Sequence, residues 1–213
     1  MSIVLKYFTI GLWLVVVTGP AVAAERVCTY RTWEWDTLAK KAINPRLLSK
    51  PRRELSTEER GPINGCSVCA EDQVEVRLDG VPPFQICRAF GDRIRRAIAK
   101  ARAEGFPILS VVGYRVGKSK GPLNAAGVRT QFSNHSYGTA IDFNADKNGL
   151  YDHCAHFDQH CQLRRGGEYR PHDRAALTKA SSLYRALKDE GFKWGGEIQG
   201  KQKDFMHFSM TGM

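Results

Sequence analysis

The chain has 213 residues, 42% of them hydrophobic, and carries 32 Lys and Arg against 22 Asp and Glu, a formal net charge of +10. A chain of this length can bury one sizeable core. The positive charge suits anionic partners, but the basic residues are scattered and form no stripe interleaved with aromatic residues. The composition therefore indicates a globular domain with solvated basic faces and argues against a nucleic-acid-binding protein.

The first residues have the layout of a secretory signal peptide. Lys6 precedes an apolar run over 7–17, a Gly-Pro pair ends that run, and Ala21-Val22-Ala23 forms a small-residue cleavage signal. The apolar run is shorter than the roughly 20 residues that span a bilayer. We therefore expect a cleaved signal peptide over 1–23, no stable membrane anchor afterwards, and a periplasmic or extracellular location.

All six cysteines follow the expected cleavage point, and an even number of cysteines in an exported chain is typical of disulfides. They are Cys28, Cys66, Cys69, Cys87, Cys154 and Cys161. Six cysteines allow fifteen pairings, and the sequence does not choose among them.

The stretch "DHCAHFDQHC" over 152–161 holds three histidines and two cysteines, and at first sight it suggests a metal site. In an exported chain, however, Cys154 and Cys161 are expected to close a local disulfide. The histidines would then decorate a small loop that borders the substrate cleft. A zinc or copper site in the loop is the alternative.

Residues 24–80 contain several Pro and Gly residues, and we expect them to form an irregular lead-in segment pinned by cysteines. A domain over 81–213 should follow. Apolar residues at helical spacing predict a helix from Ile86 to Ala101, ended by Gly105. A buried strand over 108–115 and a loop over 117–127 come next.

"GTAIDFN" predicts a short strand in which Ala140 and Asp142 share a face. A long polar loop follows, then an amphipathic helix over 173–190 and a last strand over 205–210. This order of elements predicts an α+β fold with a small, mainly antiparallel sheet flanked by helices.

Two stretches supply two imidazoles and two carboxylates. "SNHSYGTAIDFN" contains His135 and Asp142, and "KDFMHF" contains Asp204 and His207. A catalytic zinc needs three protein ligands and one open position, which His135, Asp142 and His207 would provide. Asp204 would remain free to act as general base.

These two stretches, together with "GYR" at 113–115 and "WGG" at 194–196, resemble the zinc murein peptidases of the VanY and VanX type. That family includes D-Ala-D-Ala carboxypeptidases, dipeptidases and L-Ala-D-Glu endopeptidases. Its pattern is S-x-H-x6-D followed by D/E-x-x-H, and the resemblance runs from about Ile86 to the end. It implies a Hedgehog/D-Ala-D-Ala-peptidase-like fold.

The resemblance also implies residue roles. Zinc would be held by His135, Asp142 and His207, with Asp204 as general base and Arg115 stabilising the oxyanion. A structural ion pair is the alternative for Arg115. Candidate substrate contacts are Ser133, Tyr137 and Trp194, with core packing as the alternative for the two aromatic residues. Which peptide bond is cleaved stays open.

A second metal was considered after the "GTAIDFN" strand, where oxygen-bearing side chains alternate as in part of a calcium loop. The candidate ligands lie within Asn144–Asp152, namely Asn144, Asp146, Asn148 and Asp152. The twelfth position would be Ala155 rather than Glu, and plain turns have the same composition.

The leading hypothesis is therefore an exported, monomeric zinc peptidase that hydrolyses amide bonds in peptidoglycan stem peptides, as a D,D-carboxypeptidase or an endopeptidase. The first alternative is a non-catalytic zinc-containing module of the same fold that binds cell-wall material or protein. The second is an extracellular DNA- or polysaccharide-binding protein that relies on the basic charge.

Overall fold

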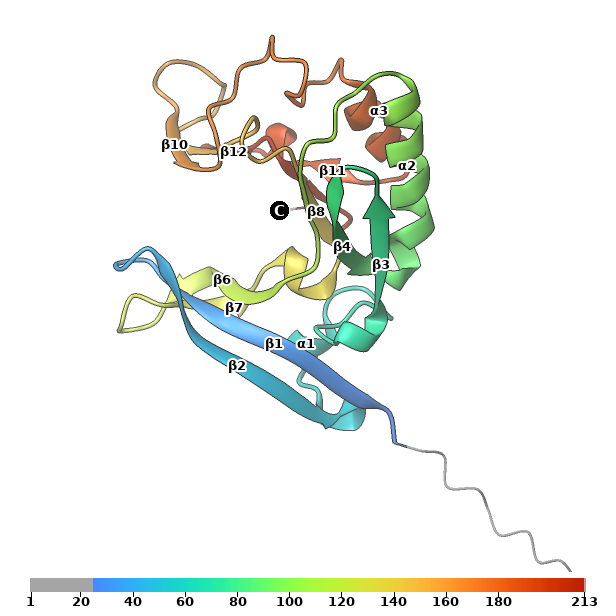
Figure 1. Ribbon diagram of the computed structural model, residues 1–213. Coiled ribbons are helices and arrows are strands. Elements are labelled where there is room, and N and C mark those ends of the chain that lie inside the picture. Colours follow the sequence, from blue (N-terminus) through green and yellow to red (C-terminus); the bar gives the residue numbers. More distant parts are fainter. Residues whose placement is uncertain (1–24, 213) are drawn as a thin grey trace, which may run out of the picture.

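The computed structural model describes residues 25–212, so the expected signal peptide over 1–23 lies outside the described residues. Small sheets and two longer helices make up the fold (Figure 1). The expected α+β class and the mainly antiparallel pairing are confirmed, but the strands form four sheets of two to four strands rather than one. No helix within 25–212 has the length and apolar character needed to cross a bilayer.

The N-terminal sheet has the strand order β2-β1-β6-β7. Its strands are β1 (Val27–Asp36), β2 (Lys41–Pro51), β6 (Val116–Leu123) and β7 (Arg129–Phe132). The β1–β2 pair is a long antiparallel hairpin, whereas β1 and β6 run parallel. The prediction of an irregular segment over 24–80 is therefore wrong, and so is the prediction of a loop over 117–127.

The local sequences of these strands do not predict strand structure, for physical reasons. In β1, buried Cys28, Tyr30 and Thr32 alternate with more exposed residues, but only one of the three is a strongly apolar strand former. Strand β2 is a largely exposed edge strand that contains Pro45, which is tolerated there because one edge needs no partner. Strand β6 carries glycines and a proline that ordinarily indicate a loop.

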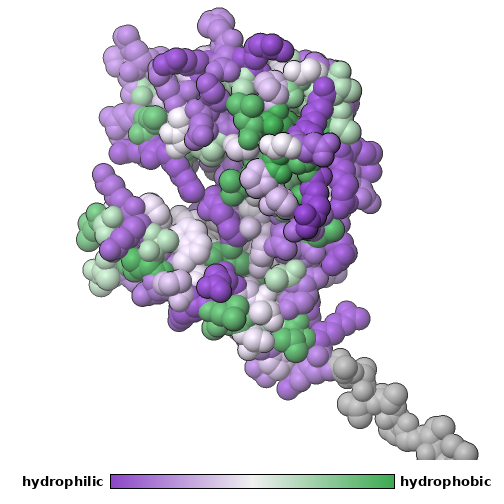
Figure 2. Space-filling model, in the orientation of Figure 1, coloured by the Kyte–Doolittle hydropathy of each residue, from purple (hydrophilic) through white to green (hydrophobic). Residues whose placement is uncertain are grey.

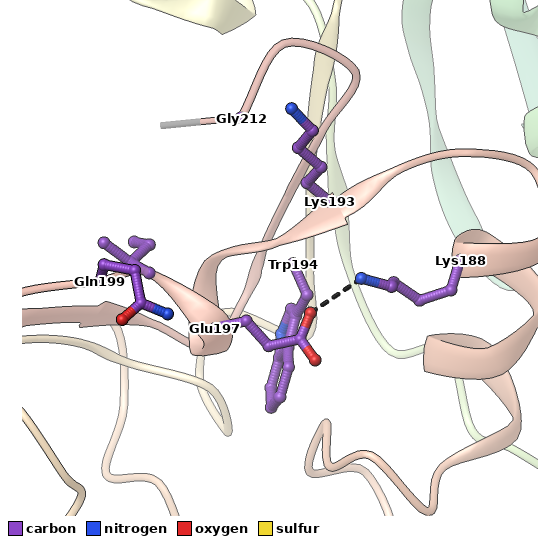
Figure 3. Close-up of a pocket in the computed structure, with 7 residues that line it drawn as sticks. Lys188, Lys193, Trp194, Glu197, Gln199 and Gly212 are labelled. Atoms are coloured by element: carbon purple, nitrogen blue, oxygen red, sulfur yellow. Dashed lines mark hydrogen bonds and ion pairs between the residues drawn. The ribbon is translucent and has the colours of Figure 1, made fainter.

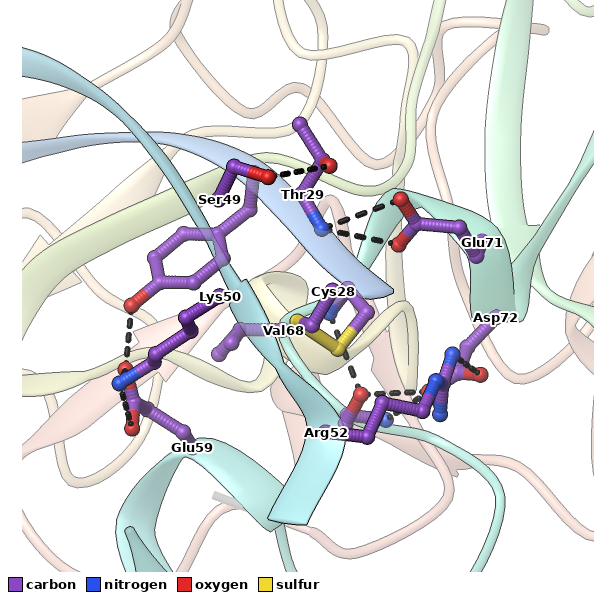
Figure 4. The surroundings of a disulfide bond; sticks show 12 residues. Cys28, Thr29, Ser49, Lys50, Arg52, Glu59, Val68, Glu71 and Asp72 are labelled. Atoms are coloured by element: carbon purple, nitrogen blue, oxygen red, sulfur yellow. Dashed lines mark hydrogen bonds and ion pairs between the residues drawn. A yellow bond between two sulfur atoms is a disulfide. The ribbon is translucent and has the colours of Figure 1, made fainter. Parts of the chain in front are cut away.

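Two disulfides hold the N-terminal segment in place. Cys28–Cys69 ties the start of β1 to the segment before η2 (Ala70–Asp72). Cys66–Cys87 ties that same segment to the end of β4 (Val81–Cys87). Around the first of these, the Thr29 amide donates to the Glu71 carboxylate (Figure 4). The neighbouring cysteines 66 and 69 therefore serve two different bridges and do not form a redox pair.

A hairpin of β3 (Gln73–Leu78) and β4 (Val81–Cys87) links this segment to the rest of the chain. The hairpin crosses the expected domain boundary at residue 81. The antiparallel sheet that carries the candidate site has the order β11-β13-β8-β5. Its strands are β11 (Lys193–Trp194), β13 (His207–Ser209), β8 (Ala140–Phe143) and β5 (Val111–Val112).

The expected strand over 108–115 is thus reduced to β5, while β8 lies inside the predicted "GTAIDFN" strand. A three-stranded sheet of order β10-β9-β12 lies beside the site. Its strands are β9 (Leu150–Asp152), β10 (Gln162–Arg165) and β12 (Gln202–Asp204). Part of the segment expected to be a long polar loop therefore pairs as strands.

Helices α2 (Gly91–Ala103) and α3 (Ser182–Asp189) pack against each other. Their apolar stripes, including Ile94, Ile98 and Leu187, enter the main core with β8 and β13 residues. Both helices are shorter than predicted: Ile86 belongs to β4, and turns precede α3. The remaining helical turns are η1 (Arg52–Glu54), α1 (Thr57–Arg60), η3 (Arg88–Phe90), η4 (Asn134–Tyr137) and η5 (Gly195–Glu197).

Candidate active site

Strand pairing brings two of the expected metal ligands together. Asp142 on β8 lies directly opposite His207 on β13 in the antiparallel register. Residues opposite each other on neighbouring strands project from the same face of the sheet. Both side chains are almost fully buried, with 7% of Asp142 and 4% of His207 exposed. The pairing of β8 with β13 thus brings together two residues that lie 65 positions apart in the sequence.

His135 reaches the same point from η4. The turn after η4 requires a left-handed residue, and Gly138 adopts φ +62° there. A side chain at this glycine would also collide with Gln73 and the Cys87 amide. The Nδ1 atom of His135 lies 2.8 Å from the Gly113 carbonyl oxygen. Since a carbonyl can only accept, Nδ1 carries the proton and Nε2 is left with a free lone pair.

The three ligand atoms converge. His135 Nε2 lies 3.1 Å from Asp142 Oδ1 and 3.3 Å from His207 Nδ1, and His207 Nδ1 lies 2.9 Å from Asp142 Oδ1. Ligand atoms bound to one tetrahedral zinc at 2.0–2.1 Å lie about 3.3 Å from each other. The buried His-Asp-His set therefore fits a zinc ion in donor chemistry and in spacing.

Ring nitrogens of two histidines and the Arg115 guanidinium surround the Asp142 carboxylate. Burial by itself raises its pKa, but His135 and His207 outweigh that effect and hold the pKa well below its usual range. Its second oxygen, Oδ2, lies 3.4 Å from the Arg115 guanidinium. Burial lowers the pKa of Arg115, and Asp142 opposes that shift. Asp142 is therefore ionised, as a metal ligand must be.

Asp204, the expected base, ends β12 three residues before His207. The Asp204 backbone lies against Gly195. A Cβ atom added to that glycine would come within 2.2 Å of the Asp204 carbonyl oxygen. Glycine is thus required for β12 to approach so closely. Burial raises the pKa of Asp204 to about 6, with His207 lowering it and Asp142 raising it further. Its Oδ1 atom is buried without a hydrogen-bond partner among residues 25–212.

The three expected substrate contacts have different surroundings. Ser133 is 5% exposed, and its hydroxyl has no partner among the described residues. Tyr137 packs edge-to-face on Phe132. The indole of Trp194 donates to the Phe205 carbonyl at 2.8 Å, and one part of it lines a pocket beside Lys188 and Glu197 (Figure 3). The two aromatic residues have packing roles, and substrate contact by them stays a prediction.

The other metal hypotheses fail on geometry. Cys154 and Cys161 form the expected local disulfide, so neither offers a thiolate. None of the three histidines of that loop belongs to a potential metal cluster among residues 25–212. In the proposed calcium loop, the side-chain oxygens of Asn144 and Asn148 accept hydrogen bonds from backbone amides of Leu109 and Leu177. These hydrogen bonds hold the two oxygens in the fold and argue against calcium ligation by Asn144 and Asn148.

Two cations near the site were missed. Lys120 on β6 and Arg165 on β10 both act electrostatically on Asp204. Neither belongs to the motifs that identified the ligands. Lys120 lies in a segment expected to be a loop, and only the strand registers bring the two cations to the site. The sequence carried no signal for either.

Residues 126–210 match the family model described as D-alanyl-D-alanine carboxypeptidase. Neither the curated proteins nor the solved structures compared with the chain include a significant match. The matched segment runs from just before β7 to just after β13 and contains His135, Asp142, Asp204 and His207. It begins after Arg115 and Lys120. This segment, which is less than half of the chain, is therefore similar to the peptidase family that the model describes.

Proposed function

We propose that the chain is an exported, zinc-dependent peptidase that hydrolyses amide bonds in peptidoglycan stem peptides. The observation that carries the proposal is the convergence of His135, Asp142 and His207, with the unpartnered carboxylate of Asp204 beside them. Three disulfides support export, because such bonds persist in oxidising compartments. The family match supports a peptidoglycan substrate.

Zinc bound by this set would polarise the scissile carbonyl and lower the pKa of a water molecule. The chain's own residues supply the proton transfers. Asp204, with a pKa raised to about 6, is matched to accept a proton from the attacking water near neutral pH. It then returns that proton to the leaving amine. Asp204 is thereby assigned to the leaving-group side of the scissile bond.

Arg115 is assigned to the developing oxyanion. Its guanidinium is partly buried and touches Asp142 with one Nη atom, while its Nε has no partner among the described residues. A fixed cation in a poorly solvated site stabilises negative charge more strongly than one in water. The Ser133 hydroxyl, also unpartnered, is assigned to a polar group of the substrate.

A non-catalytic binding module is the second candidate, since the same zinc set could hold the fold around a recognition surface. Asp204 favours the enzyme. A buried carboxylate without a hydrogen-bond partner destabilises a fold, so a module without turnover gains nothing from keeping it.

The test uses the purified, metal-loaded chain with muropeptides, and mass spectrometry of the products. We expect release of an amino acid or a short peptide, and loss of this release after chelation. Asp204→Asn should lower kcat by about 10²–10⁴ while the metal content stays at one per chain. Asp152→Asn is the matched control, because it removes a carboxylate on the neighbouring strand that is paired with Arg164. Full activity of Asp204→Asn would refute the base assignment, and no product from the zinc-loaded chain would favour the binding module.

A further inference from the structure

Three cations from two segments of the chain lie around two carboxylates at the site. Arg115 precedes β6, Lys120 lies on β6 and Arg165 ends β10, while the carboxylates are Asp142 and Asp204. Arg115 is paired with Asp142. Lys120 and Arg165 make no ion pair within 4.0 Å with any residue between 25 and 212. The structure thus holds two cations at the site that no carboxylate of the described chain neutralises.

The register of the three-stranded sheet places Arg165 in one row with Asp204. Arg165 on β10 is opposite Leu150 on β9, and Leu150 is opposite Asp204 on β12. The three residues form one row across the sheet and project from the same face, with the outer two about 10 Å apart at Cα. An arginine side chain can cover most of that span. The charge of Arg165 acts on Asp204 and also on Arg115.

Lys120 approaches from the opposite side. The β6–β7 pairing has a bulge between Lys118 and Lys120, so the two lysines turn to opposite faces. The ammonium group of Lys118 lies over the Phe132 ring, whereas Lys120 acts on Asp204 and Asp142. Figure 2 shows a hollow, rimmed by hydrophilic side chains, between the part of the molecule with β6 and β7 and the part with β10 and β12. Strand β6, which carries Lys120, and strand β10, which carries Arg165, belong to the two parts on either side of this hollow.

The described residues leave an excess of positive charge at the site, carried by the half-buried Lys120 and the exposed Arg165. The three cations exceed the two carboxylates by one charge, and a divalent ion on neutral histidines adds two more. Lys120 is also half-buried, and burial lowers its pKa. A partly desolvated cation without a partner is unfavourable, so an arriving anion would be bound strongly there.

We infer that Lys120 and Arg165 form a carboxylate-binding subsite on the leaving-group side of Asp204. This inference rests on the proposed function, in which Asp204 protonates the leaving amine. The group nearest to that amine in a peptide cleaved at its last bond is the terminal carboxylate of the released amino acid. The two cations therefore select a substrate with a free carboxyl end, and cleavage of the last peptide bond.

The test compares two substrates on the metal-loaded chain: a stem pentapeptide with a free terminal carboxylate and the same peptide as its C-terminal amide. Measured at a pH at which Asp204 is ionised in every variant, Lys120→Met and Arg165→Met should each lower kcat/KM for the free acid by about tenfold. They should leave kcat/KM for the amide nearly unchanged, so that the acid-to-amide ratio of kcat/KM falls by the same factor. A third peptide, with only the glutamate α-carboxylate amidated, tests the other carboxylate of the stem and should behave like the free acid.

Matched controls exist on the same strands. Lys118→Met removes a lysine that faces away from the site, and Arg164→Met removes the arginine next to Arg165 that is paired with Asp152. Both controls should keep the wild-type acid-to-amide ratio. A merely structural effect of Lys120→Met or Arg165→Met would lower both substrates together.

An unchanged acid-to-amide ratio in Lys120→Met and Arg165→Met would overturn the inference. So would a result in which amidating the glutamate α-carboxylate, and not the terminal carboxylate, makes the substrate insensitive to the two substitutions. If the wild-type chain hydrolyses neither peptide, the proposed function fails, and calorimetric binding of the same peptides still decides the subsite. Tighter binding of the free acid by the wild type, lost in both variants, would support the subsite without turnover. Equal binding of acid and amide would refute it.

Discussion

Two histidine-bearing regions of this molecule behave in opposite ways. The loop over 152–161 concentrates three histidines and two cysteines, yet its histidines are exposed and its cysteines are bonded to each other. His135, Asp142 and His207 are spread over 73 positions, yet their ligand atoms meet within 4.8 Å in a buried site. Ligand density in the sequence is thus a poor guide to a metal site, because strand register decides which side chains meet.

The loop is nevertheless connected to the site. Phe157, at its centre, packs edge-to-face on Tyr151, Tyr169 and Phe205. Phe205 directly follows Asp204, so the disulfide loop is anchored beside the expected base. This supports the prediction that the loop borders the substrate cleft, although its histidines are turned to solvent.

The largest expected effect comes from replacing the histidines of each region in turn and measuring the metal content, which tests which region holds the metal. His135→Ala or His207→Ala should reduce zinc from one per chain to none and abolish turnover, because two remaining protein ligands leave the site incomplete. The triple variant His153→Ala, His156→Ala and His160→Ala should keep one zinc. Elemental analysis after dialysis gives the answer, and zinc loss in the triple variant would move the metal to the loop.

The next largest effect concerns pH. Asp204 must be ionised to accept a proton, and burial raises its pKa to about 6. The group is protonated below that value, so kcat/KM should fall about tenfold per pH unit on the acid side and level off above it. A zinc ion nearby would move this limb to lower pH. Asp158→Asn, which alters a carboxylate of the exposed loop, should leave the profile unchanged; a shifted profile would weaken the assignment to Asp204.

The smallest effect on the site should come from opening the loop. The double variant Cys154→Ser with Cys161→Ser removes a bridge with a sequence separation of 7, and loop-closure entropy gives a loss of about 2.5 kcal/mol in the free energy of unfolding. Cys28→Ser with Cys69→Ser, which opens a separation of 41, should cost about 4 kcal/mol. Denaturant unfolding measures both. Zinc content should stay at one per chain in the loop variant, and its loss would contradict the separation of the two regions.

The sequence by itself predicted the α+β class, the three residues His135, Asp142 and His207 that the structure brings together, and the local disulfide. These features have local signals: alternation places Asp142 inside a short strand, the "DFMHF" stretch carries Asp204 and His207, and two cysteines a few residues apart are easily bridged. The family match over 126–210 covers the same stretches.

Only the tertiary structure decided the rest. Strands β1, β2 and β6 have weak local signals, because they contain prolines, glycines and charged residues, and they are stabilised by pairing between distant segments and by two disulfides. A bulge in β6 and a row across three strands place Lys120 and Arg165 where their charges act on Asp204. Such placements depend on long-range register, which no local pattern of residues encodes.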